Sequence, residues 1–357
     1  MKKTILLTGG LGYIGSHTCV VLEQAGFRTV LLDNLSNSSL SSLDGIERIL
    51  GYRPVFYDAD IRDRGAMASL LKSNDFAGVI HFAGLKAVGE SVESPFEYYN
   101  NNIQGSFVFF EEMERTGLRN IVFSSSATVY AADNTLPLTE ASKLGTTNSY
   151  GTSKLTLEFV LRDLVSAKAW NAIALRYFNP IGAHASGYIG ERPKGVPNNL
   201  LPYILDVAIG KRERVGVYGD DYDTVDGTGV RDYIDVNDLA EAHLAAIQKL
   251  LASPTTPLPV FSPSPPAPLL SEEMGAKSSF QAINIGTGQG TSVLEMIENV
   301  RLASGKSIPY AILARRPGDL GSVYADPSLA RELLGWEVKR SVREAVGSSW
   351  KFVHDNR

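Results

Sequence analysis

The chain has 357 residues, of which 44% are hydrophobic and 20% are charged, a composition typical of a folded protein of one or two domains. The net charge is −5, and the sequence has no basic stripe. Neither feature indicates a protein that binds nucleic acid. The longest apolar runs, such as residues 5–8 and 20–22, are far shorter than the roughly 18 residues that a membrane span needs.

Cysteine and histidine usage argues against a metal site. The single Cys19 excludes an intramolecular disulfide and a cysteine-rich metal site. The five histidines show no ligand spacing, so we expect no protein-bound metal.

The charged start of the chain lacks the sustained apolar region and the cleavage site of a signal peptide. We therefore expect a first strand there and a cytoplasmic location.

Short apolar segments alternate with helix-like segments over the first half of the chain. The segments expected to be strands are 4–8, 28–33, 55–60, 79–82, 120–124 and 171–177. The segments expected to be helices are 15–26, 67–73, 102–115 and 149–168. This alternation predicts an α/β fold with a doubly wound parallel sheet of the Rossmann type.

The composition changes after Phe178. Residues 179–235 are rich in Gly, Pro, Asn and Asp, which favours a smaller C-terminal α/β lobe over the carboxyl edge of the sheet. We therefore expect a cofactor-binding domain over 1–178 and a mainly substrate-binding lobe over 179–357, with a helix at 236–251 and a strand at 281–285 returning to the first domain.

A proline-rich segment interrupts the second half. Residues 253–268 contain seven prolines and cannot hold a helix or a central strand. A surface insertion over 253–279 is the simplest interpretation, and a partner-binding role for the prolines is the alternative.

A glycine-rich loop follows the first predicted strand. Gly10, Gly12 and Gly15 fit G-x-G-x-x-G, and Gly9, Gly12 and Gly15 fit G-x-x-G-x-x-G. Such glycines permit a tight turn and a close approach to a pyrophosphate at the helix N-terminus. A glycine-rich turn without a ligand is the alternative interpretation of the loop alone.

Acidic residues at the ends of the next two predicted strands favour a dinucleotide. Asp33 lies 18 residues after Gly15, where a carboxylate accepts hydrogen bonds from the adenosine ribose and repels a 2′-phosphate. Arg28 lies at the wrong end of its strand to offset that repulsion. Asp60 and Ile61 suit contacts with the adenine edge. The sequence therefore predicts NAD rather than NADP.

Tyr150 and Lys154 form the candidate catalytic pair. Residues four apart on a helix share a face, so the phenol and the ammonium can reach one site. Lowering a tyrosine pKa from its ordinary value near 10 to neutrality takes about 4 kcal/mol, which an adjacent ammonium and a positive nicotinamide can supply. Ser126, in the serine run after the predicted fifth strand, is the candidate hydrogen-bond partner. A chance Tyr-x-x-x-Lys and a polar strand end are the alternatives for each feature alone.

With these residues in place, the chain resembles the UDP-galactose 4-epimerases of the extended short-chain dehydrogenase/reductase superfamily. The resemblance covers nearly the whole chain apart from the proline-rich segment. Its motifs are GGLGYIGSHTCV (9–20), LDN (32–34), HFAGLKAVGES (81–91), FSSSATVY (123–130), LRYFNP (175–180), VPNNLLPY (196–203) and DGTGVRDYI (226–234).

The resemblance implies NAD-dependent inversion at C4 of a UDP-hexose in galactose metabolism. It implies that Tyr150 exchanges the proton of the sugar 4-hydroxyl, that Lys154 lowers the tyrosine pKa and binds the cofactor ribose, and that Ser126 supports the proton transfer. The implied cofactor contacts are Gly9, Gly12, Tyr13, Ile14, Gly15, Asp33, Asn34, Asn37, Asp60, Ile61, Phe82, Ala83, Lys86, Asn101, Ser124, Tyr150, Lys154 and Tyr177. The implied UDP-sugar contacts are Ser126, Tyr150, Phe178, Asn179, Asn199, Leu200, Tyr218, Arg231, Arg316, Asp319 and Val323.

Three positions depart from the family pattern. Asp235 replaces a frequent histidine and Val225 replaces an acid, and neither has an expected catalytic part. Val323 stands where relatives that exclude N-acetylated sugars carry tyrosine. The small valine predicts some turnover of UDP-GlcNAc and UDP-GalNAc, and a merely packed valine is the alternative.

Two other functions compete with epimerisation. A nucleotide-sugar dehydratase or decarboxylase shares the fold, but the dehydratase acid pair is replaced by Ala127 and Thr128, which cannot carry protons in that way. A catalytically inactive NAD sensor would lose Tyr150 or Lys154. By analogy with relatives, we expect a homodimer formed by the helices that follow Asn101 and Tyr150.

Overall fold

One parallel sheet lies at the centre of the molecule. The structure, a computed structural model, describes residues 2–252, 279–316 and 318–356, and within these ranges seven strands pair in the order β11-β6-β5-β4-β1-β2-β3. All of the paired strands in this sheet are parallel. The strands are β1 (Thr4–Thr8), β2 (Arg28–Asp33), β3 (Val55–Asp58), β4 (Phe76–His81), β5 (Asn120–Ser126), β6 (Asn171–Tyr177) and β11 (Phe280–Ile285). The predicted Rossmann-type α/β fold is confirmed.

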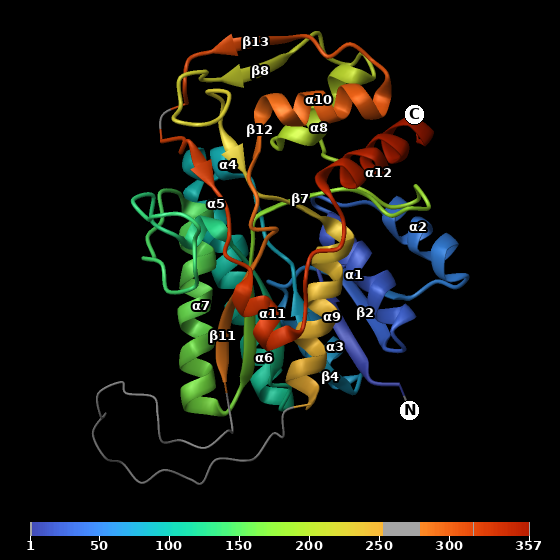
Figure 1. Ribbon diagram of the computed structural model, residues 1–357. Coiled ribbons are helices and arrows are strands. Elements are labelled where there is room, and N and C mark those ends of the chain that lie inside the picture. The colour runs from blue at the N-terminus through green and yellow to red at the C-terminus, as the bar shows by residue number, and fades with distance from the viewer. Residues whose placement is uncertain (1, 253–278, 317, 357) are drawn as a thin grey trace.

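Helices cover both faces of the sheet (Figure 1). One face packs against α1 (Tyr13–Gln24), α2 (Leu40–Leu50), α9 (Val236–Ala252) and α11 (Ser328–Leu334). The other packs against α3 (Arg64–Lys72), α6 (Gly105–Thr116) and α7 (Ser149–Lys168). In β1, Ile5 and Leu7 enter the first core and Leu6 enters the second, because successive strand residues point to opposite faces. Cys19 of α1 is buried in the first core.

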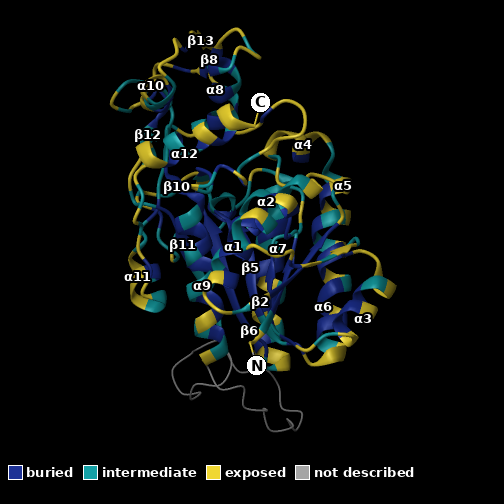
Figure 2. Ribbon diagram, turned by 90° about the vertical axis from the view of Figure 1, so that its right-hand side faces the viewer, coloured by how far each residue is buried: buried dark blue, intermediate teal, exposed yellow. Residues whose placement is uncertain are grey.

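A second lobe lies beyond the carboxyl ends of the strands, at the top of Figure 1. Its apolar core is formed largely by α8 (Leu200–Ala208), α10 (Val293–Ser304), α12 (Val342–Asp355) and β8 (Val215–Tyr218). The mostly exposed β13 (Tyr310–Leu313) pairs with β8 at the edge of this lobe. Short pairings connect it to the sheet through β7 (Asn179–Ile181), β9 (Val230–Arg231), β10 (Tyr233–Asp235), β12 (Thr291–Ser292) and β14 (Ser322–Val323). Figure 2 shows the buried strands between helices that are exposed on their outer sides.

Most predicted elements are present, with shifted ends. The predictions for 4–8, 28–33, 149–168 and 171–177 match, whereas β3 ends at Asp58, β4 begins at Phe76 and β5 continues to Ser126. Two helices, α1 and α3, begin before their predicted starts, whereas α6 begins at Gly105, after its predicted start at residue 102, and continues from an irregular helical segment. That segment contains α4 (Val88–Glu93), α5 (Pro95–Tyr98) and a π-helical turn (Tyr99–Gln104). The helix α2 was not predicted, and the expected insertion at 253–279 lies almost wholly outside the described residues.

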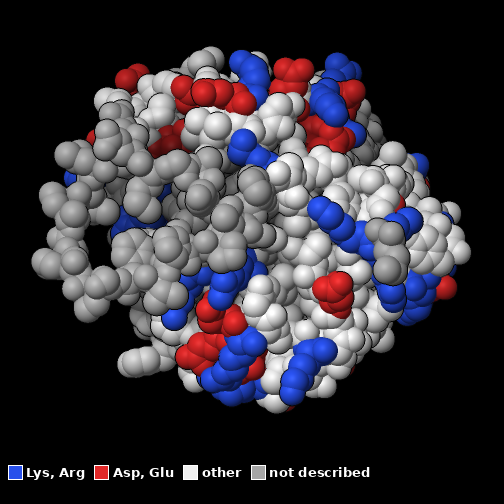
Figure 3. Space-filling view, turned by 90° about the horizontal axis from the view of Figure 1, so that it is seen from below, with Lys and Arg blue, Asp and Glu red and all other residues white. Residues whose placement is uncertain are grey.

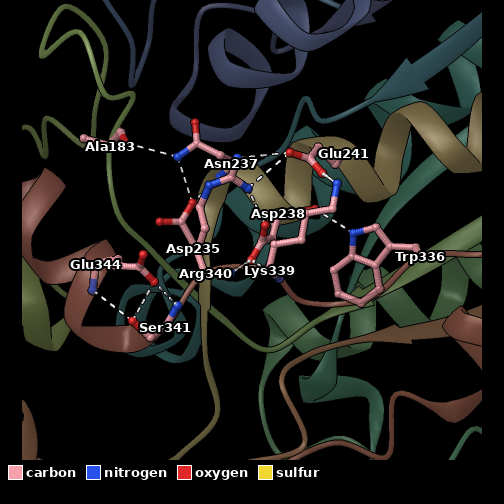
Figure 4. A network of polar contacts seen from close by, with 10 residues as sticks. All are labelled: Ala183, Asp235, Asn237, Asp238, Glu241, Trp336, Lys339, Arg340, Ser341 and Glu344. Atoms are coloured by element: carbon pink, nitrogen blue, oxygen red, sulfur yellow. Dashed lines mark hydrogen bonds and ion pairs between the residues drawn. The ribbon is translucent and has the colours of Figure 1, made fainter.

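A buried aspartate holds the segment before α12 against α9. Asp238 of α9 accepts hydrogen bonds from the backbone N–H groups of Lys339 (3.0 Å) and Arg340 (2.9 Å) and from the Arg340 guanidinium, as Figure 4 shows. The indole N–H of Trp336 donates to the Asp238 carbonyl oxygen at 2.9 Å. This network fixes the second lobe to the sheet.

The opposite end of the molecule carries charges of both signs. Seen from below, Lys and Arg side chains lie among Asp and Glu side chains (Figure 3). Among the described residues, no helix is both long and apolar enough to cross a membrane.

Candidate active site

The glycine loop joins β1 to α1, and its glycines lie so close to neighbouring backbone atoms that a side chain would not fit. Gly9 has a φ of +68°, and a Cβ there would lie 2.8 Å from the backbone N of Ala83. A Cβ on Gly15 would lie 2.5 Å from the carbonyl oxygen of Gly9. Gly12 is the N-cap of α1 and has no capping side chain. The amide groups of the first helical turn, where Tyr13 and Ile14 lie, are therefore available to an anion such as a pyrophosphate.

The Asp33 carboxylate lies beside the glycine loop and accepts hydrogen bonds from three donors. One carboxylate oxygen accepts a hydrogen bond from the N–H of Leu11 at 3.0 Å. The other accepts from the N–H of Leu35 at 3.0 Å and from the Ser38 hydroxyl at 2.7 Å. These donors hold the carboxylate beside the glycine loop, where a ribose would lie.

Asp60 lies after β3, which neighbours β2. Its carboxylate pairs with Arg62 at 2.7 Å and accepts a hydrogen bond from the Asn34 amide at 2.8 Å. The hydrogen bond from Arg62 is the main cause that lowers the pKa of Asp60 to about 2. Ile61 is buried beside Gly105 of α6. The two predicted acids thus lie at adjacent strand ends, and this edge suits the adenosine half of a dinucleotide.

An aromatic cluster lies beyond the glycine loop. The ring centroids of Phe82 and His243 are 4.8 Å apart, and those of Tyr177 and His243 are 5.2 Å apart. The Tyr177 hydroxyl and Nε2 of His243 also form a hydrogen bond. Sequence analysis predicted Phe82 and Tyr177 but missed His243, because a lone histidine on α9 has no spacing signal.

Lys86 and Asn199 share one partner in the described structure. Lys86 Nζ lies 3.3 Å from a carboxylate oxygen of Glu191, and the Asn199 amide donates to the same oxygen at 2.8 Å. The predicted cofactor lysine and the predicted substrate amide are therefore brought together by a carboxylate that sequence analysis did not identify.

The amide next to predicted Asn101 is the more deeply buried one. Asn101 donates to the side chain of Asn102 at 2.9 Å. Asn102 accepts from the N–H of Leu85 at 2.8 Å and donates to the hydroxyl of Ser153 at 3.0 Å. It thereby ties the loop after β4 to the catalytic helix α7. The π-helical turn decides which amide of the Asn run faces inward, and this turn has no sequence signature.

The Ser126 hydroxyl at the end of β5 is oriented by Thr128. Its oxygen accepts hydrogen bonds from the Thr128 N–H at 3.2 Å and from the Thr128 hydroxyl at 3.0 Å. Because both acceptor positions are engaged, the proton of Ser126 is left to donate elsewhere. Gly151 permits the approach of α7, since a Cβ there would lie 2.7 Å from the Thr128 carbonyl oxygen.

Tyr150 and Lys154 lie in the first two turns of α7. Asn148 caps the helix by accepting a hydrogen bond from the N–H of Gly151 at 2.8 Å. Lys154 Nζ donates to the carbonyl oxygen of Ser124 at 2.6 Å and lies 5.8 Å from the centroid of the Tyr150 ring. The helix thus directs the phenol and the ammonium toward the end of β5, where Ser126 lies.

Burial shifts the pKa values of both members of this pair. Burial raises the pKa of Tyr150, and a hydrogen bond with Ser126 opposes the shift. Burial also lowers the pKa of Lys154 to about 7. Burial therefore disfavours the charged form of both side chains in the protein without a bound cofactor.

The predicted substrate contacts fall into two groups. In the first, Val323 of β14 pairs with Arg231 of β9 in parallel register and packs in an apolar cluster with Phe178. Asn179 begins β7 directly after Phe178. One Nη of Arg231 donates to the carbonyl oxygen of Leu320 at 3.0 Å, which fixes the guanidinium beside β14.

The second group lies at the end of β8. The Arg316 guanidinium lies 3.8 Å from the centroid of the Tyr218 ring, and the N–H of Asp319 donates to the Arg316 carbonyl oxygen at 3.2 Å. Leu200 begins α8 in the same lobe. The second lobe therefore carries the predicted uridine-diphosphate contacts, while β5 and α7 of the first domain carry the predicted catalytic groups.

Other candidate features lie elsewhere. A cavity of about 540 Å³ opens between α8, α12 and residues 191–197 and includes Tyr13 in its lining, but not Ser126, Tyr150 or Lys154. Asp235 is buried and hydrogen-bonded to Asn237. Within the described ranges, no group of three or more His, Cys, Asp or Glu could hold a metal ion.

Comparisons with known proteins agree with this geometry. The model of the NAD dependent epimerase/dehydratase family matches residues 5–256. A UDP-glucose 4-epimerase of Bacillus subtilis (strain 168) is 50% identical over 353 residues, which cover 99% of this chain and 97% of the relative. One of Homo sapiens is 48% identical and covers 100% of this chain and 98% of the relative.

A solved structure shows the same similarity. The crystal structure of UDP-glucose 4-epimerase from Bifidobacterium longum in complex with NAD+ and UDP has a TM-score of 0.89 and 45% sequence identity, with 99% of both chains covered. The residues matched by the family model, 5–256, include the glycine loop, Tyr150 and Lys154. The chain belongs to the NAD-dependent epimerase/dehydratase family and, within it, to the UDP-glucose 4-epimerases.

Proposed function

We propose that this chain interconverts UDP-glucose and UDP-galactose by inverting C4 of the hexose with bound NAD. Full-length relatives at about half identity carry this activity in their names. The observation that carries the proposal is the approach of α7, with Tyr150 and Lys154, to the end of β5 beside the glycine loop. The chain would serve galactose metabolism.

The residues of the loop fit the cofactor. A Cβ on Gly9 or Gly15 would collide with backbone atoms. Three hydrogen bonds hold the Asp33 carboxylate beside the loop, which supports its role as the ribose contact. A nicotinamide held there would supply the reversible hydride acceptor that inversion at C4 requires.

Three side chains, Tyr150, Ser126 and Lys154, have different roles in the proton transfer. Tyr150 takes the proton of the 4-hydroxyl as a general base and returns it as a general acid. Ser126 donates its free proton toward the reacting oxygen, and Lys154 binds the ribose and favours the phenolate when protonated. Because the ketone formed at C4 must present its other face, the sugar turns while the uridine end stays bound.

The second lobe supplies the contacts that keep the uridine diphosphate bound. Arg231 and Arg316 suit a diphosphate because a guanidinium can bind it with two parallel hydrogen bonds. Asn199, Leu200 and Tyr218 line the uridine side. Residues 1–178 would thus hold NAD, and residues 179–357 would mainly hold the UDP-sugar, with α9 and β11 returning to the sheet.

A turnover assay without added cofactor tests the proposal. Purified protein mixed with UDP-galactose is expected to produce UDP-glucose. A stable 4-keto-6-deoxy sugar would instead indicate a dehydratase, and no reaction would indicate a sensor.

Substitution of Tyr150 by Phe tests the role of the phenol. The ring is retained and the proton carrier is lost, so we expect kcat to fall by roughly 10²- to 10⁴-fold while the circular dichroism spectrum stays unchanged. Full-speed inversion in this variant would contradict the proton role of Tyr150.

We extend the proposal to N-acetylated sugars. Val323 packs against the cluster that contains Phe178 and Ala127, next to the proposed sugar position, and its small side chain leaves room for an acetamido group. Rates on UDP-GlcNAc and UDP-galactose should be compared in wild type and in Val323→Tyr. The tyrosine should reduce only the N-acetylated rate, and an unmeasurable wild-type rate would refute the extension.

A homodimer in the cytoplasm completes the proposal. Phe107 of α6 and Phe159 of α7 are each about two-fifths exposed, which supports a shared apolar interface between these helices and a second copy. A monomeric mass by light scattering would contradict it. The lone buried Cys19 is compatible with a reducing compartment.

A further inference from the structure

A buried ion pair joins the catalytic helix to the sheet. Glu158 of α7 and Arg176 of β6 have side chains that are 2% and 4% exposed. The Nη2 atom of Arg176 lies 2.6 Å from Oε2 of Glu158, and Nε lies 3.0 Å from Oε1. The two groups therefore meet through two parallel hydrogen bonds, an arrangement that fixes orientation as well as distance.

Hydrogen bonds extend this pair across three neighbouring strands. Ser125 of β5 donates its hydroxyl proton to Glu158. Arg176 donates to the hydroxyl oxygen of Tyr130 at 3.0 Å, and Tyr130 donates to Asn284 of β11 at 2.6 Å. One point of α7 is therefore held by β5, β6 and β11 together.

The pair lies on the catalytic face of α7. Glu158 follows Lys154 by four residues and Tyr150 by eight, so the three side chains share one side of the helix. Its partner Ser125 directly follows Ser124, whose carbonyl oxygen accepts the hydrogen bond from Lys154. The buried pair lies about 12 Å along the helix from Tyr150. The hydrogen bond between Glu158 and Ser125 joins α7 to β5, the same two elements that carry the catalytic groups.

Stability gives little reason for charges at this position. Desolvation of a buried ion pair offsets most of its attraction, and apolar replacements of similar volume are often neutral or stabilising. Apolar packing, however, tolerates small sliding movements of a helix, whereas a two-pronged ion pair does not. The distinctive contribution of this pair is therefore geometric.

We infer that Glu158 and Arg176 are positioning residues, which hold α7 at the depth and rotation where Tyr150 reaches the Ser126 hydroxyl. This inference rests on the proposed function. Neither residue contacts the reacting atoms. Their effect is transmitted through α7, whose N-terminal turns carry the phenol and the ammonium.

The test compares Glu158→Gln with a matched control, Asp238→Asn. Asp238 is also fully buried and paired with an arginine, Arg340, but it holds the second lobe rather than α7 (Figure 4). In the full-length holoprotein we expect Glu158→Gln to lower kcat on the order of tenfold to a hundredfold with KM little changed. We expect Asp238→Asn to keep the wild-type kcat when rates are normalised to folded protein.

Hydrogen exchange supplies a readout that needs no turnover. The peptide covering residues 149–156 is expected to exchange faster in Glu158→Gln than in Asp238→Asn at matched unfolding midpoints. Equal exchange and equal normalised kcat in the two variants would overturn the inference.

A milder variant covers the case in which Glu158→Gln does not fold. Ser125→Ala removes one hydroxyl of the network and is expected to lower kcat severalfold, and a wild-type kcat would count against the positioning role. If wild-type protein itself shows no epimerisation, the proposed function fails, whereas the exchange comparison still reports whether the ion pair orders α7.

Discussion

Thr128 orients the hydroxyl that the proposed reaction uses. Its own hydroxyl donates to Ser126 Oγ at 3.0 Å, which fixes the direction in which the Ser126 proton can point. Thr128→Val keeps the shape and removes this donor. Because a neutral hydrogen bond contributes about 1 kcal/mol, we expect kcat to fall about fivefold, measured with UDP-galactose. An unchanged kcat would show that the backbone N–H of residue 128 orients Ser126 alone.

Lys154 makes the unfolding free energy of the cofactor-free protein depend on pH in the alkaline range. Burial lowers its pKa from 10.5 to about 7. Between these values the unfolded chain binds a proton that the folded protein has released, so this group's contribution to stability rises with pH. Its penalty is complete below pH 7 and is relieved toward pH 10.5.

The variant Lys154→Met isolates that contribution. We expect it to exceed wild type by a few kcal/mol in unfolding free energy at pH 7, with the difference closing as the pH rises to 10. Urea titrations of both proteins measure the difference, from which other titrating groups cancel. A constant gap would show that Lys154 stays charged in the folded protein.

At the scale of elements, the glycine loop and α1 form one rigid turn. A Cβ on Gly15 would lie 2.5 Å from the Gly9 carbonyl oxygen, so Gly15→Ala must separate the loop from the helix. We expect the purified variant to carry less than about a tenth of the wild-type NAD, because backbone approach to the pyrophosphate is lost. Acid release followed by enzymatic NAD assay measures this content.

A helical glycine elsewhere provides the control. A Cβ on Gly347 of α12 would meet nothing within 4 Å, so Gly347→Ala should keep full NAD content and gain up to about 1 kcal/mol of stability. Loss of NAD in both variants would indicate general unfolding rather than a defect of the loop.

The sequence predicted local elements better than long-range ones. The apolar runs of β1, β2 and β6 and the Tyr150 helix are visible because burial on both faces or a repeated spacing leaves a pattern. The two-residue strands β9 and β14 leave none, since they exist only where Arg231 and Val323 meet across 92 residues of chain.

The same limit applies within the candidate site. Gly9, Asp33 and Tyr150 were identified by motif spacing. Glu191 and Asn102 were missed, because their roles follow from partners that only the folded chain brings near.

At the scale of the whole molecule, buried histidines set the acid limit of stability. Burial lowers the pKa to about 3 for His17 and His81 and to about 4 for His243. Below pH 6.5 these histidines bind protons in the unfolded chain but stay neutral in the folded protein. Stability is therefore lost as the pH falls. At pH 5 each histidine is expected to contribute a loss of about 2 kcal/mol.

Urea midpoints between pH 7 and pH 5 test this expectation. The ring nitrogen Nε2 of His17 has no hydrogen-bond partner, which makes His17→Gln the mildest of the possible replacements. That variant should lose about 2 kcal/mol less stability over the interval than wild type. An equal loss in both proteins would place the acid sensitivity elsewhere.

The burial of Cys19 has a practical consequence for following motions in solution. Its side chain is inaccessible, and burial raises the pKa of the thiol to about 12, so it is inert toward maleimide dyes at neutral pH. Since the chain has no other cysteine, a thiol introduced on an exposed face of α10 would be the one point of attachment. A fluorophore placed there would report on the second lobe of the native protein without prior removal of any residue.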